Sequence, residues 1–355
     1  MARIWVLGNG QLGAMLKQAA NPLNLTVIPV DIDSTAAIDL APGDLVTAER
    51  EQWPETPITQ QLANHPNFVN LSVFPTLADR KTQKSLIDQL GLGTAPWRAV
   101  EGNTTAADLH QQLGENVLLK RRSGGYDGRG QHWLRTSAPS QIPEDWGDHA
   151  IAEQAIAFDE ELSLVGARDR DGKVFFYPLT LNLNTDGILR ATVAPVARLQ
   201  QWQRQAEQML TSLLNELDYV GVMGMELFRR GDEILINELA PRVHNTGHWT
   251  QAGATINQFE YHMRAVAGLP LTQAWVKASS VMINLIGCEW DQRWLAVPGA
   301  EVYWYGKSVR PGRKVGHINL CCADTGSLIS SLQQLAPLFG EDYQQPIQWA
   351  VGHLK

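Results

Sequence analysis

Cysteine is scarce in this chain, and its scarcity excludes one class of protein. Only Cys288, Cys321 and Cys322 occur among 355 residues, without a CxxC pair. An odd count without such pairs argues against a disulfide framework and indicates a reducing compartment, so we expect a cytoplasmic protein. The sequence also lacks an apolar run of membrane-spanning length, and its N-terminal apolar run is too short for a signal peptide.

Positive charge is not in excess either. The formal net charge is −8, which argues against general nucleic-acid binding, because the cations would have to be clustered locally. Hydrophobic residues make up 44% of the chain and charged residues 19%, the balance of a folded globular protein with two or three domains. We therefore expect neither nucleic acid nor membrane as a partner.

The first hundred residues alternate apolar β-favouring runs with helical patterns. This βαβ order predicts a parallel sheet with helices on its faces, in a small Rossmann-like domain. The predicted elements are strands at 3–8, 25–33 and 67–71, and helices at 11–20, 56–65 and 77–91.

Beyond residue 96 the pattern becomes that of an α+β body. Turns at Asp171-Gly172 and Gly231-Asp232 each separate two β-favouring runs, which predicts two hairpins. Further helices are predicted at 104–114, 200–217, 256–268 and 325–338.

The stretch "KRRSGGYDGRGQ" (120–131) combines four glycines with four basic side chains. The preceding run "NVLLK" predicts a strand, and "QHWL" begins a second one. A hairpin needs one or two glycines, whereas four glycines flanked by cations let backbone N–H groups approach an anion closely. We interpret the stretch as an anion-binding flap; a long flexible turn with solvated charges is the alternative.

Gly8, Gly10 and Gly13 match the spacing G-x-G-x-x-G between the first strand and helix, and Asp31 ends the next strand. This pattern is typical of a dinucleotide site, although it is weak on its own. The geometry favours a phosphate or carboxylate near the helix N-terminus without identifying it. A purely structural tight turn is the alternative.

A P-loop is absent. The tetrapeptide "YGKS" at 305–308 resembles the end of one, but Glu301 occupies the position of its first glycine. Any use of ATP therefore needs another kind of site.

Two acidic residues interrupt apolar runs on the paired strands of the second hairpin. Glu226 lies in "GMELF" and Glu238 in "INELA", and a lone carboxylate in such a run is costly unless it is paired or bound to a metal. With Asn237 they form a set of hard oxygen ligands suited to Mg²⁺, which keeps waters and nucleotide phosphates as its other ligands. Two solvent-facing acids on an edge strand are the alternative.

The segment after this hairpin, "APRVHNTGHWTQAG", brings Arg242, His244, Asn245 and His248 together. His244 and His248 stand four apart, as zinc ligands on a helix can, but Gly247 argues against a helix and no third ligand is evident. We predict a substrate-binding loop, with a satisfied surface turn as the alternative.

A second basic cluster lies in "GKSVRPGRKVGH". It contains Lys307, Arg310, Arg313 and Lys314 around a Pro-Gly turn. In a chain of negative net charge such a patch is suited to a phosphate, and a solvated loop is the alternative.

These pieces, in this order, resemble the ATP-grasp superfamily and, within it, the 5-(carboxyamino)imidazole ribonucleotide synthase family of purine biosynthesis. The resemblance rests on "GNGQLG", "KRRSGGYDGRGQ", "EQAIAFDEELSL", "NELAPRVHNTGHWT" and "GKSVRPGRKVGH", and extends over essentially the whole chain. It implies an ATP-grasp fold, α/β and α+β, with a small C-terminal β-rich domain. The implied domains are a Rossmann-like pre-ATP-grasp domain at 1–96, a lid with the flap at 97–178, and a C-terminal ATP-grasp and substrate-phosphate-binding domain at 179–355.

The resemblance also implies an activity. Such a ligase carboxylates 5-aminoimidazole ribonucleotide with bicarbonate and ATP, forming a C–N bond and giving ADP and phosphate through carboxyphosphate. The implied cofactors are ATP and Mg²⁺, with Mn²⁺ as a possible substitute, and homodimers are common in the family.

Roles at individual positions follow from the same resemblance. The implied catalytic residues are Lys120, Tyr126, Asp127, Arg242 and His244. The nucleotide would contact Arg80, Lys120, Gly124, Gly125, Tyr126, Asp127, Gly128, Arg129, Gly130, Gln131, Glu153, Gln154, Ala155, Ile156, Glu161, Asn237 and Glu238. The metal would be held by Glu226 and Glu238. The aminoimidazole nucleotide would be seated by Gly8, Gly10, Gln11, Leu12, Arg242, His244, Lys307, Arg313 and Lys314.

Some positions depart from the family's commoner pattern. Asn9 replaces a glycine, Arg129 a lysine and Val243 a proline. More consequential is "LNLN", where relatives often read Glu-Asn-x-His, because Asn184 stands in place of a histidine that contacts the nucleotide. We do not carry that contact over.

The implied mechanism asks the protein for positioning and charge neutralisation. Bicarbonate is a poor acylating agent, and phosphorylation by ATP converts it to a reactive mixed anhydride. The flap would close over this anhydride and exclude water. The acceptor of the amine proton is left open among Asp127, His244 and the departing phosphate.

Three other functions compete with this one. A different ATP-grasp carboxylate–amine ligase, such as a formate-using one, would share Lys120 and the two glutamates. An NAD-dependent dehydrogenase would use the Gly8–Gly13 loop, and a non-catalytic sensor would bind Mg·ATP without hydrolysing it.

Overall fold

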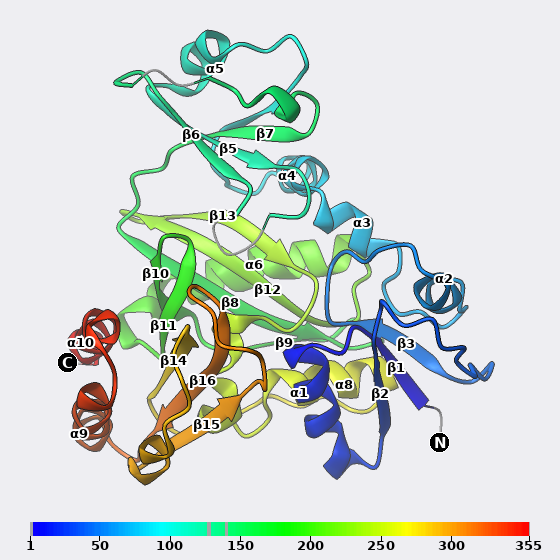
Figure 1. Cartoon of the computed structure of the whole chain (residues 1–355), viewed down its shortest axis with the longest axis vertical. Coiled ribbons are helices and arrows are strands. Elements are labelled where there is room, and N and C mark those ends of the chain that lie inside the picture. Colours follow the sequence, from blue (N-terminus) through cyan, green and yellow to red (C-terminus); the bar gives the residue numbers. More distant parts are fainter. Residues whose placement is uncertain (1–2, 126–128, 139–140, 355) are drawn as a thin grey trace.

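The computed structural model describes residues 3–125, 129–138 and 141–354, whose strands form three sheets (Figure 1). Tyr126, Asp127 and Gly128 of the predicted flap lie outside the described residues. A three-stranded sheet lies near the N-terminus, a four-stranded sheet at the top of Figure 1, and a nine-stranded sheet in the body of the molecule.

The N-terminal sheet is parallel, as its sequence pattern predicted. β1 (Arg3–Leu7) lies between β2 (Thr26–Val30) and β3 (Leu45–Ala48), and α1 (Gln11–Ala20) connects β1 to β2. Four of the five residues of β1 are buried, because side chains on both faces of a parallel sheet are covered.

The strand predicted at 67–71 is wrong, and β3 was not predicted. Residues 67–71 form turns that join β3 through an isolated bridge between Val46 and Phe68. Asn70 adopts a left-handed φ of 65°, which regular strands do not contain. Its side-chain amide binds the backbone of Val220 at 2.7 and 2.8 Å, so tertiary contacts decide its conformation.

The helix predicted at 77–91 begins later, at Arg80. Asp79 is its N-cap, since its carboxylate accepts a hydrogen bond from Lys81 N at 2.8 Å. The helices of this part of the chain are α2 (Pro57–Ala63), α3 (Val73–Ala78) and α4 (Arg80–Gln89). In Figure 1, α4 lies just below the four-stranded sheet.

The four-stranded sheet lies within 97–178, the range predicted for the lid. Its antiparallel order is β4 (Trp97–Val100), β7 (Ala150–Gln154), β5 (Asn116–Arg121) and β6 (Gln131–Arg135). α5 (Ala106–Leu113) covers it and buries Leu109 and Leu113 against Val117 and Leu119. β5 and β6 flank the glycine-rich stretch, as the sequence predicted.

The nine-stranded sheet is antiparallel and contains both predicted hairpins. Its order is β13-β12-β8-β10-β11-β14-β16-β15, with β9 paired to β8. The strands are β8 (Glu160–Arg168), β9 (Val174–Phe176), β10 (Thr180–Thr185), β11 (Ile188–Ala194), β12 (Gly221–Arg230), β13 (Glu233–Ala240), β14 (Ser280–Ile286), β15 (Ala300–Trp304) and β16 (Lys314–Cys321). The limit proposed at residue 178 leaves β8 and β9 in the lid range, although both pair within this sheet.

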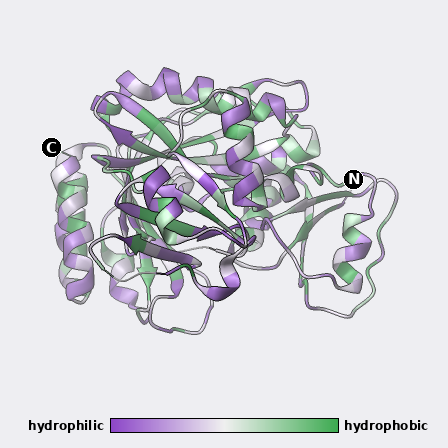
Figure 2. Cartoon of the chain, turned by 90° about the horizontal axis from the view of Figure 1, so that it is seen from above, coloured by the Kyte–Doolittle hydropathy of each residue, from purple (hydrophilic) through white to green (hydrophobic). Residues whose placement is uncertain are grey.

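Helices cover this sheet with their apolar faces. They are α6 (Gln200–Glu216), α7 (Thr250–Gly253), α8 (Gln258–Ala267), α9 (Thr325–Leu335) and α10 (Gln344–His353). Leu210 and Leu213 of α6 share a core with Leu162 and Leu164 of β8. Figure 2 shows hydrophobic residues concentrated in the inner strands, with hydrophilic bands along the surrounding helices. Within the described ranges, no helix combines the length and apolarity needed to span a membrane.

Candidate active site

Glu226 and Glu238 face each other across the β12–β13 hairpin. They are direct partners in the antiparallel register, and the register shifts immediately after Glu226. Their side chains are 29% and 34% exposed, so both are partly withdrawn from water. Like charges placed opposite each other on one face destabilise a sheet unless a cation lies between them.

The surroundings of the two carboxyl groups shift their pKa values in opposite directions. Burial and the negative charge of Glu238 raise the pKa of Glu226. Burial also acts to raise the pKa of Glu238, but the Arg80 guanidinium, 3.0 Å away, outweighs it and leaves this pKa below its ordinary value. The pair fits Mg²⁺, which needs one or two protein carboxylates besides phosphates and water. No cluster of three or more acidic, histidine or cysteine side chains among the described residues forms a complete protein cage.

Lys120 belongs to a buried ionic cluster beside this pair. Its Nζ lies 2.6 Å from Glu153 Oε2 and donates to Asn237 Oδ1 at 3.2 Å. Lys84 of α4 binds the other oxygen of Glu153 at 2.9 Å. Burial acts to raise the pKa of Glu153, but the two lysines lower it to about 2. Sequence reasoning missed Lys84, because a lysine on an amphipathic helix normally faces solvent.

Arg80 connects this site to the flap. Its Nη1 binds Glu238, and its Nη2 donates to the carbonyl of Gly125 at 3.2 Å. Gly124 and Gly130 have φ values of 77° and 69°, which favour glycine. The Gly130 carbonyl accepts a hydrogen bond from Arg121 N at 2.8 Å, which closes the base of the loop.

The predicted adenine segment leads from the lid to the central sheet. Gln154 N donates to Pro96 O at 2.8 Å and Ala155 N to Asn116 O at 3.0 Å. Beyond it, Glu161 accepts a hydrogen bond from Asn184 Nδ2. Burial raises the pKa of Glu161. The structure therefore brings Asn184 to the carboxylate predicted to bind ribose.

His244 lies at the same carboxylates. Its Nε2 is 3.5 Å from Glu226 Oε1, and its Nδ1 is 2.9 Å from Thr246 Oγ1. Burial, followed by the charge of Arg242, lowers the pKa of His244 to about 3, so the imidazole is neutral. Arg242 in turn binds Glu51 at 2.9 Å, an acid that sequence reasoning missed.

His248 turns away from this group. It is 1% exposed, and its Nδ1 accepts a hydrogen bond from Gln258 Nε2 at 2.9 Å. Its ring lies against His317 with centroids 4.7 Å apart. The i,i+4 spacing of His244 and His248 therefore reflects packing.

The glycine loop of the N-terminal domain holds a carboxylate of the chain itself. Glu49 accepts hydrogen bonds from Gly10 N, at 2.5 Å, and from Gly13 N. Cβ atoms added at Gly8, Gly10 and Gly13 would lie 2.5, 2.8 and 3.2 Å from Glu49 atoms. The anion favoured at the start of this helix is therefore supplied by the protein, and the three glycines leave space for it.

Gln11 and Lys307 meet although 296 residues separate them. Lys307 Nζ donates to Gln11 Oε1 at 2.5 Å, so the structure brings together two residues that were predicted to seat one substrate. Leu12, between the loop glycines, packs against a hydrophobic core. Of the other cations in this basic cluster, Arg313 donates to Ser308 Oγ at 2.6 Å. The charge of Lys314 acts to lower the pKa of Glu226, although burial and the neighbouring carboxylates outweigh it.

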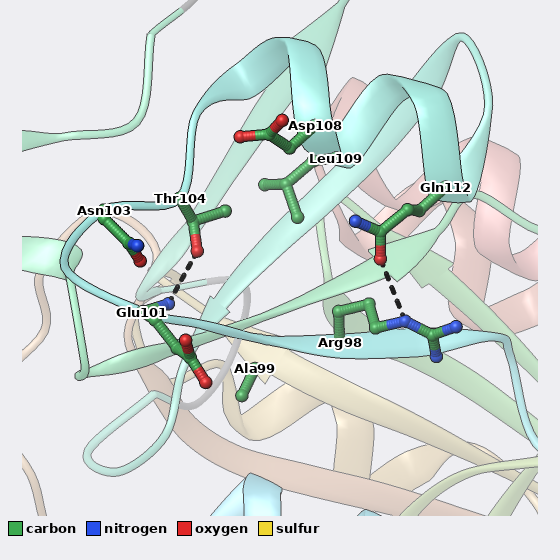
Figure 3. A pocket seen from close by; sticks show the side chains of 8 residues that line it. All are labelled: Arg98, Ala99, Glu101, Asn103, Thr104, Asp108, Leu109 and Gln112. Atoms are coloured by element: carbon green, nitrogen blue, oxygen red, sulfur yellow. Dashed lines mark hydrogen bonds between the residues drawn. The ribbon is translucent and has the colours of Figure 1, made fainter.

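A cavity of about 290 Å³ lies elsewhere, in the lid (Figure 3). It is lined by β4, α5 and their connection, including Arg98, Glu101 and Asp108. Arg98 there donates to Gln112 and Glu101 N to Thr104 Oγ1 (Figure 3). None of the residues predicted for the active site lines this cavity.

Two family models match the chain. The ATP-grasp domain matches residues 85–259, which run from α4 to α8. The phosphoribosylaminoimidazole carboxylase C-terminal domain matches residues 280–331, from β14 into α9.

Relatives match over nearly the whole length. The N5-carboxyaminoimidazole ribonucleotide synthase of Escherichia coli is 52% identical over 351 residues, which cover 99% of each chain. The crystal structure of the Thermus thermophilus synthetase has a TM-score of 0.84 at 37% identity and covers 95% of this chain and 99% of that one. The Aspergillus clavatus enzyme, solved with ADP and 5-aminoimidazole ribonucleotide, has a TM-score of 0.81 at 27% identity and covers 95% and 98%.

Proposed function

Because the chain belongs to the N5-carboxyaminoimidazole ribonucleotide synthase family of ATP-grasp enzymes, we propose how its residues divide the work of that reaction. The enzyme carboxylates 5-aminoimidazole ribonucleotide to N5-carboxyaminoimidazole ribonucleotide in purine biosynthesis. The observation that carries the division of roles is the placement of Glu226 opposite Glu238, with Arg80 bound to the second carboxylate.

The first half-reaction activates bicarbonate. ATP transfers its γ-phosphoryl group to bicarbonate and gives carboxyphosphate and ADP. Mg²⁺ bound by Glu226 and Glu238, or Mn²⁺ in its place, would neutralise charge on the phosphates. Lys120 adds a fixed ammonium, and Arg80 exchanges Glu238 for a phosphate oxygen. The flap from Gly124 to Gln131 covers the phosphates and excludes water from the anhydride.

The second half-reaction transfers the carboxyl carbon to the amine of the ribonucleotide. Arg242 and His244 face this substrate, and Lys307 with Gln11 seats its phosphate. The imidazole of His244 is neutral. When its Nδ1–H donates to Thr246 Oγ1, the lone pair of Nε2 is available to accept a proton. Asp127 and the departing phosphate are the alternative acceptors of the amine proton.

Phosphate release tests this function. ATP, bicarbonate and 5-aminoimidazole ribonucleotide are each omitted in turn, and formate replaces bicarbonate in a further reaction. We expect ribonucleotide- and bicarbonate-dependent release that formate does not support. Release with formate would identify another ATP-grasp ligase, and Mg·ATP binding without release would identify a sensor.

Two expectations that rest on the family remain proposals. They are a homodimer and a cytoplasmic location. Sedimentation equilibrium tests the first and fractionation of the source cells the second. A single-chain mass of 39.3 kDa across the micromolar range would exclude the homodimer.

A further inference from the structure

A buried chain of polar contacts connects the lid to the strand that carries Glu238. Glu153 on β7 binds Lys84 of α4 through Oε1, at 2.9 Å, and Lys120 of β5 through Oε2, at 2.6 Å. Lys84, Glu153 and Lys120 are 2%, 3% and 5% exposed. Few lysines are buried to this degree in folded proteins without a specific partner.

Both ends of this series of polar contacts lie at β13. Lys84 Nζ donates to Thr94 Oγ1 at 2.6 Å, and Thr94 Oγ1 donates to Ile236 O at 2.6 Å. At the other end, Lys120 Nζ donates to Asn237 Oδ1 at 3.2 Å. The contacts therefore form a closed ring that fixes the lysines relative to residues 236 and 237, directly before Glu238.

The charges within the ring do not balance. Two ammonium groups share one carboxylate, so one positive charge is left in excess when all three are ionised. An excess charge in a buried position is costly unless a counter-charge reaches it. Lys120 is the lysine expected to meet a nucleotide phosphate, and a phosphate oxygen supplies the missing negative charge.

We propose that Lys84 is a positioning residue of the nucleotide site. It occupies one oxygen of Glu153, so that this carboxylate cannot neutralise Lys120 completely and Lys120 keeps its charge and direction for a phosphate. The inference rests on the proposed contact between Lys120 and the nucleotide. Without Lys84, Glu153 and Lys120 form a neutral closed pair with little attraction for an anion.

Lys84→Met tests the inference, with Lys81→Met on the exposed face of the same helix as the control. Titration calorimetry with Mg·ADP measures affinity, and steady-state kinetics measure KM for ATP and for 5-aminoimidazole ribonucleotide. For Lys84→Met we expect Kd for Mg·ADP and KM for ATP to rise at least tenfold, while KM for the ribonucleotide changes less than twofold. Lys81→Met should match the wild type.

A double variant distinguishes a positioning role of Lys84 from a purely structural one. In Lys84→Met/Glu153→Gln the carboxylate is neutral, so Lys120 again carries an uncompensated charge. We expect this protein to bind Mg·ADP more tightly than Lys84→Met. If Lys84→Met does not fold, Lys84→Gln retains a donor toward Glu153 but removes the positive charge. Glu153 then neutralises Lys120 alone, so the affinity for Mg·ADP should fall as in Lys84→Met.

Two results would overturn the inference. One is an unchanged Mg·ADP affinity in Lys84→Met or Lys84→Gln, even with a lowered melting temperature. The other is a double variant that binds no better than the single one. Failure of the wild type itself to bind Mg·ADP would instead overturn the proposed function, so the two failures are distinguishable.

Discussion

Asn184 donates a hydrogen bond to the Glu161 carboxylate, so the residue that departs from the family's commoner pattern still contacts a predicted ribose ligand. The sequence identified the departure but not its partner, because the two residues lie on strands β10 and β8 that only the fold brings together. Single side chains of the proposed active site thus act in pairs: Asn184 with Glu161, Arg80 with Glu238, and Arg242 with Glu51.

Asn184→Ala should weaken the binding of ATP. A hydrogen bond to a charged group is worth about 1.5–3 kcal/mol, and its loss leaves the Glu161 carboxylate without the amide donor of Asn184. We expect KM for ATP to rise about tenfold and KM for the ribonucleotide to stay within twofold. Thr185→Ala, at the exposed neighbouring position of β10, is the control. Equal effects on both substrates would show that Asn184 does not act through the ribose carboxylate.

His244→Asn should lose carboxylation far more than nucleotide binding. The neutral imidazole lies 3.5 Å from Glu226 Oε1, in reach of the reaction centre, and proton transfer by such a group contributes about 10²–10⁴-fold to rate. We expect kcat to fall at least about 100-fold while Kd for Mg·ADP changes less than about threefold. His149→Asn, at an exposed position, controls for loss of an imidazole. Comparable losses in kcat and affinity would move His244 out of the reaction centre.

The glycine loop between β1 and α1 is filled by the Glu49 side chain and by its own backbone. A Cβ added at Gly13 would lie 2.7 Å from Gly8 O and 3.2 Å from Glu49 Oε2. The pattern that resembles a dinucleotide fingerprint is thus explained by an internal carboxylate at the start of α1. Sequence alone could predict the tight approach but not which anion approaches.

Gly13→Ala should destabilise the N-terminal domain. The added methyl group has no space between Gly8 O and Glu49, and such overpacking costs about 1–3 kcal/mol. Gly43→Ala is a matched control, because a Cβ there meets nothing within 4 Å. We expect a lowered melting temperature by differential scanning calorimetry for the first variant alone. Equal melting temperatures would mean that the loop can open to accept a side chain.

Elements with local signals were predictable. The β12–β13 hairpin was confirmed because a Gly-Asp turn lies between two apolar runs. The pairing of Glu226 with Glu238 was not predictable from this turn, because its register would pair Glu226 with Asn237 and a register shift between Glu226 and Leu227 changes the partner. The two strands that flank the flap were confirmed because each begins or ends in a short run with β-strand character. Residues 67–71 failed as a strand because Asn70 is held by the distant Val220 backbone.

Buried charges resisted prediction. Lys84, Glu49 and Glu51 owe their positions to partners far away in the chain, so no local pattern marks them. The i,i+4 histidines illustrate the opposite error, since His248 is buried against Gln258 and His317. Functional residues were therefore predicted where an acidic residue interrupts an apolar run, as Glu226 and Glu238 do. They were missed where a charged residue fits the pattern of its element, as Lys84 does in its helix.

The whole molecule is acidic, with a formal net charge of −8. Its site nevertheless gathers cations around the two glutamates, since Arg80, Lys120 and Lys314 all act on the pKa values of these carboxylates. These cations offset the carboxylates beside them, so the negative charge of the molecule is locally reduced where the anionic substrates are proposed to bind. This arrangement requires the N-terminal domain, the lid and the body to hold fixed positions.

His262 is one of the residues that hold the N-terminal domain on the body. From α8, its Nδ1 accepts from Val222 N of β12 at 3.2 Å, which leaves Nε2–H to donate to Thr47 Oγ1 of β3 at 3.0 Å. The side chain is 2% exposed, and burial lowers its pKa from 6.5 to about 4. The imidazole is therefore neutral in the folded protein, and burial opposes its protonation in acid.

Stability should consequently fall as pH decreases from about 6.5 to about 4. The folded-state pKa is depressed, so the unfolded chain binds the proton first, and His262 contributes a loss on the order of 3 kcal/mol across this window. His262→Gln retains hydrogen-bonding capacity without titrating, and its melting temperature should depend less steeply on pH between 4.5 and 7.5 (a range of about three units). The other buried histidines, His244, His248 and His317, contribute to the residual slope, because burial also lowers their pKa values. His149→Gln, exposed on the lid, should follow the wild type. Parallel curves for His262→Gln and wild type would show that the contact between β3 and β12 opens before the imidazole is protonated.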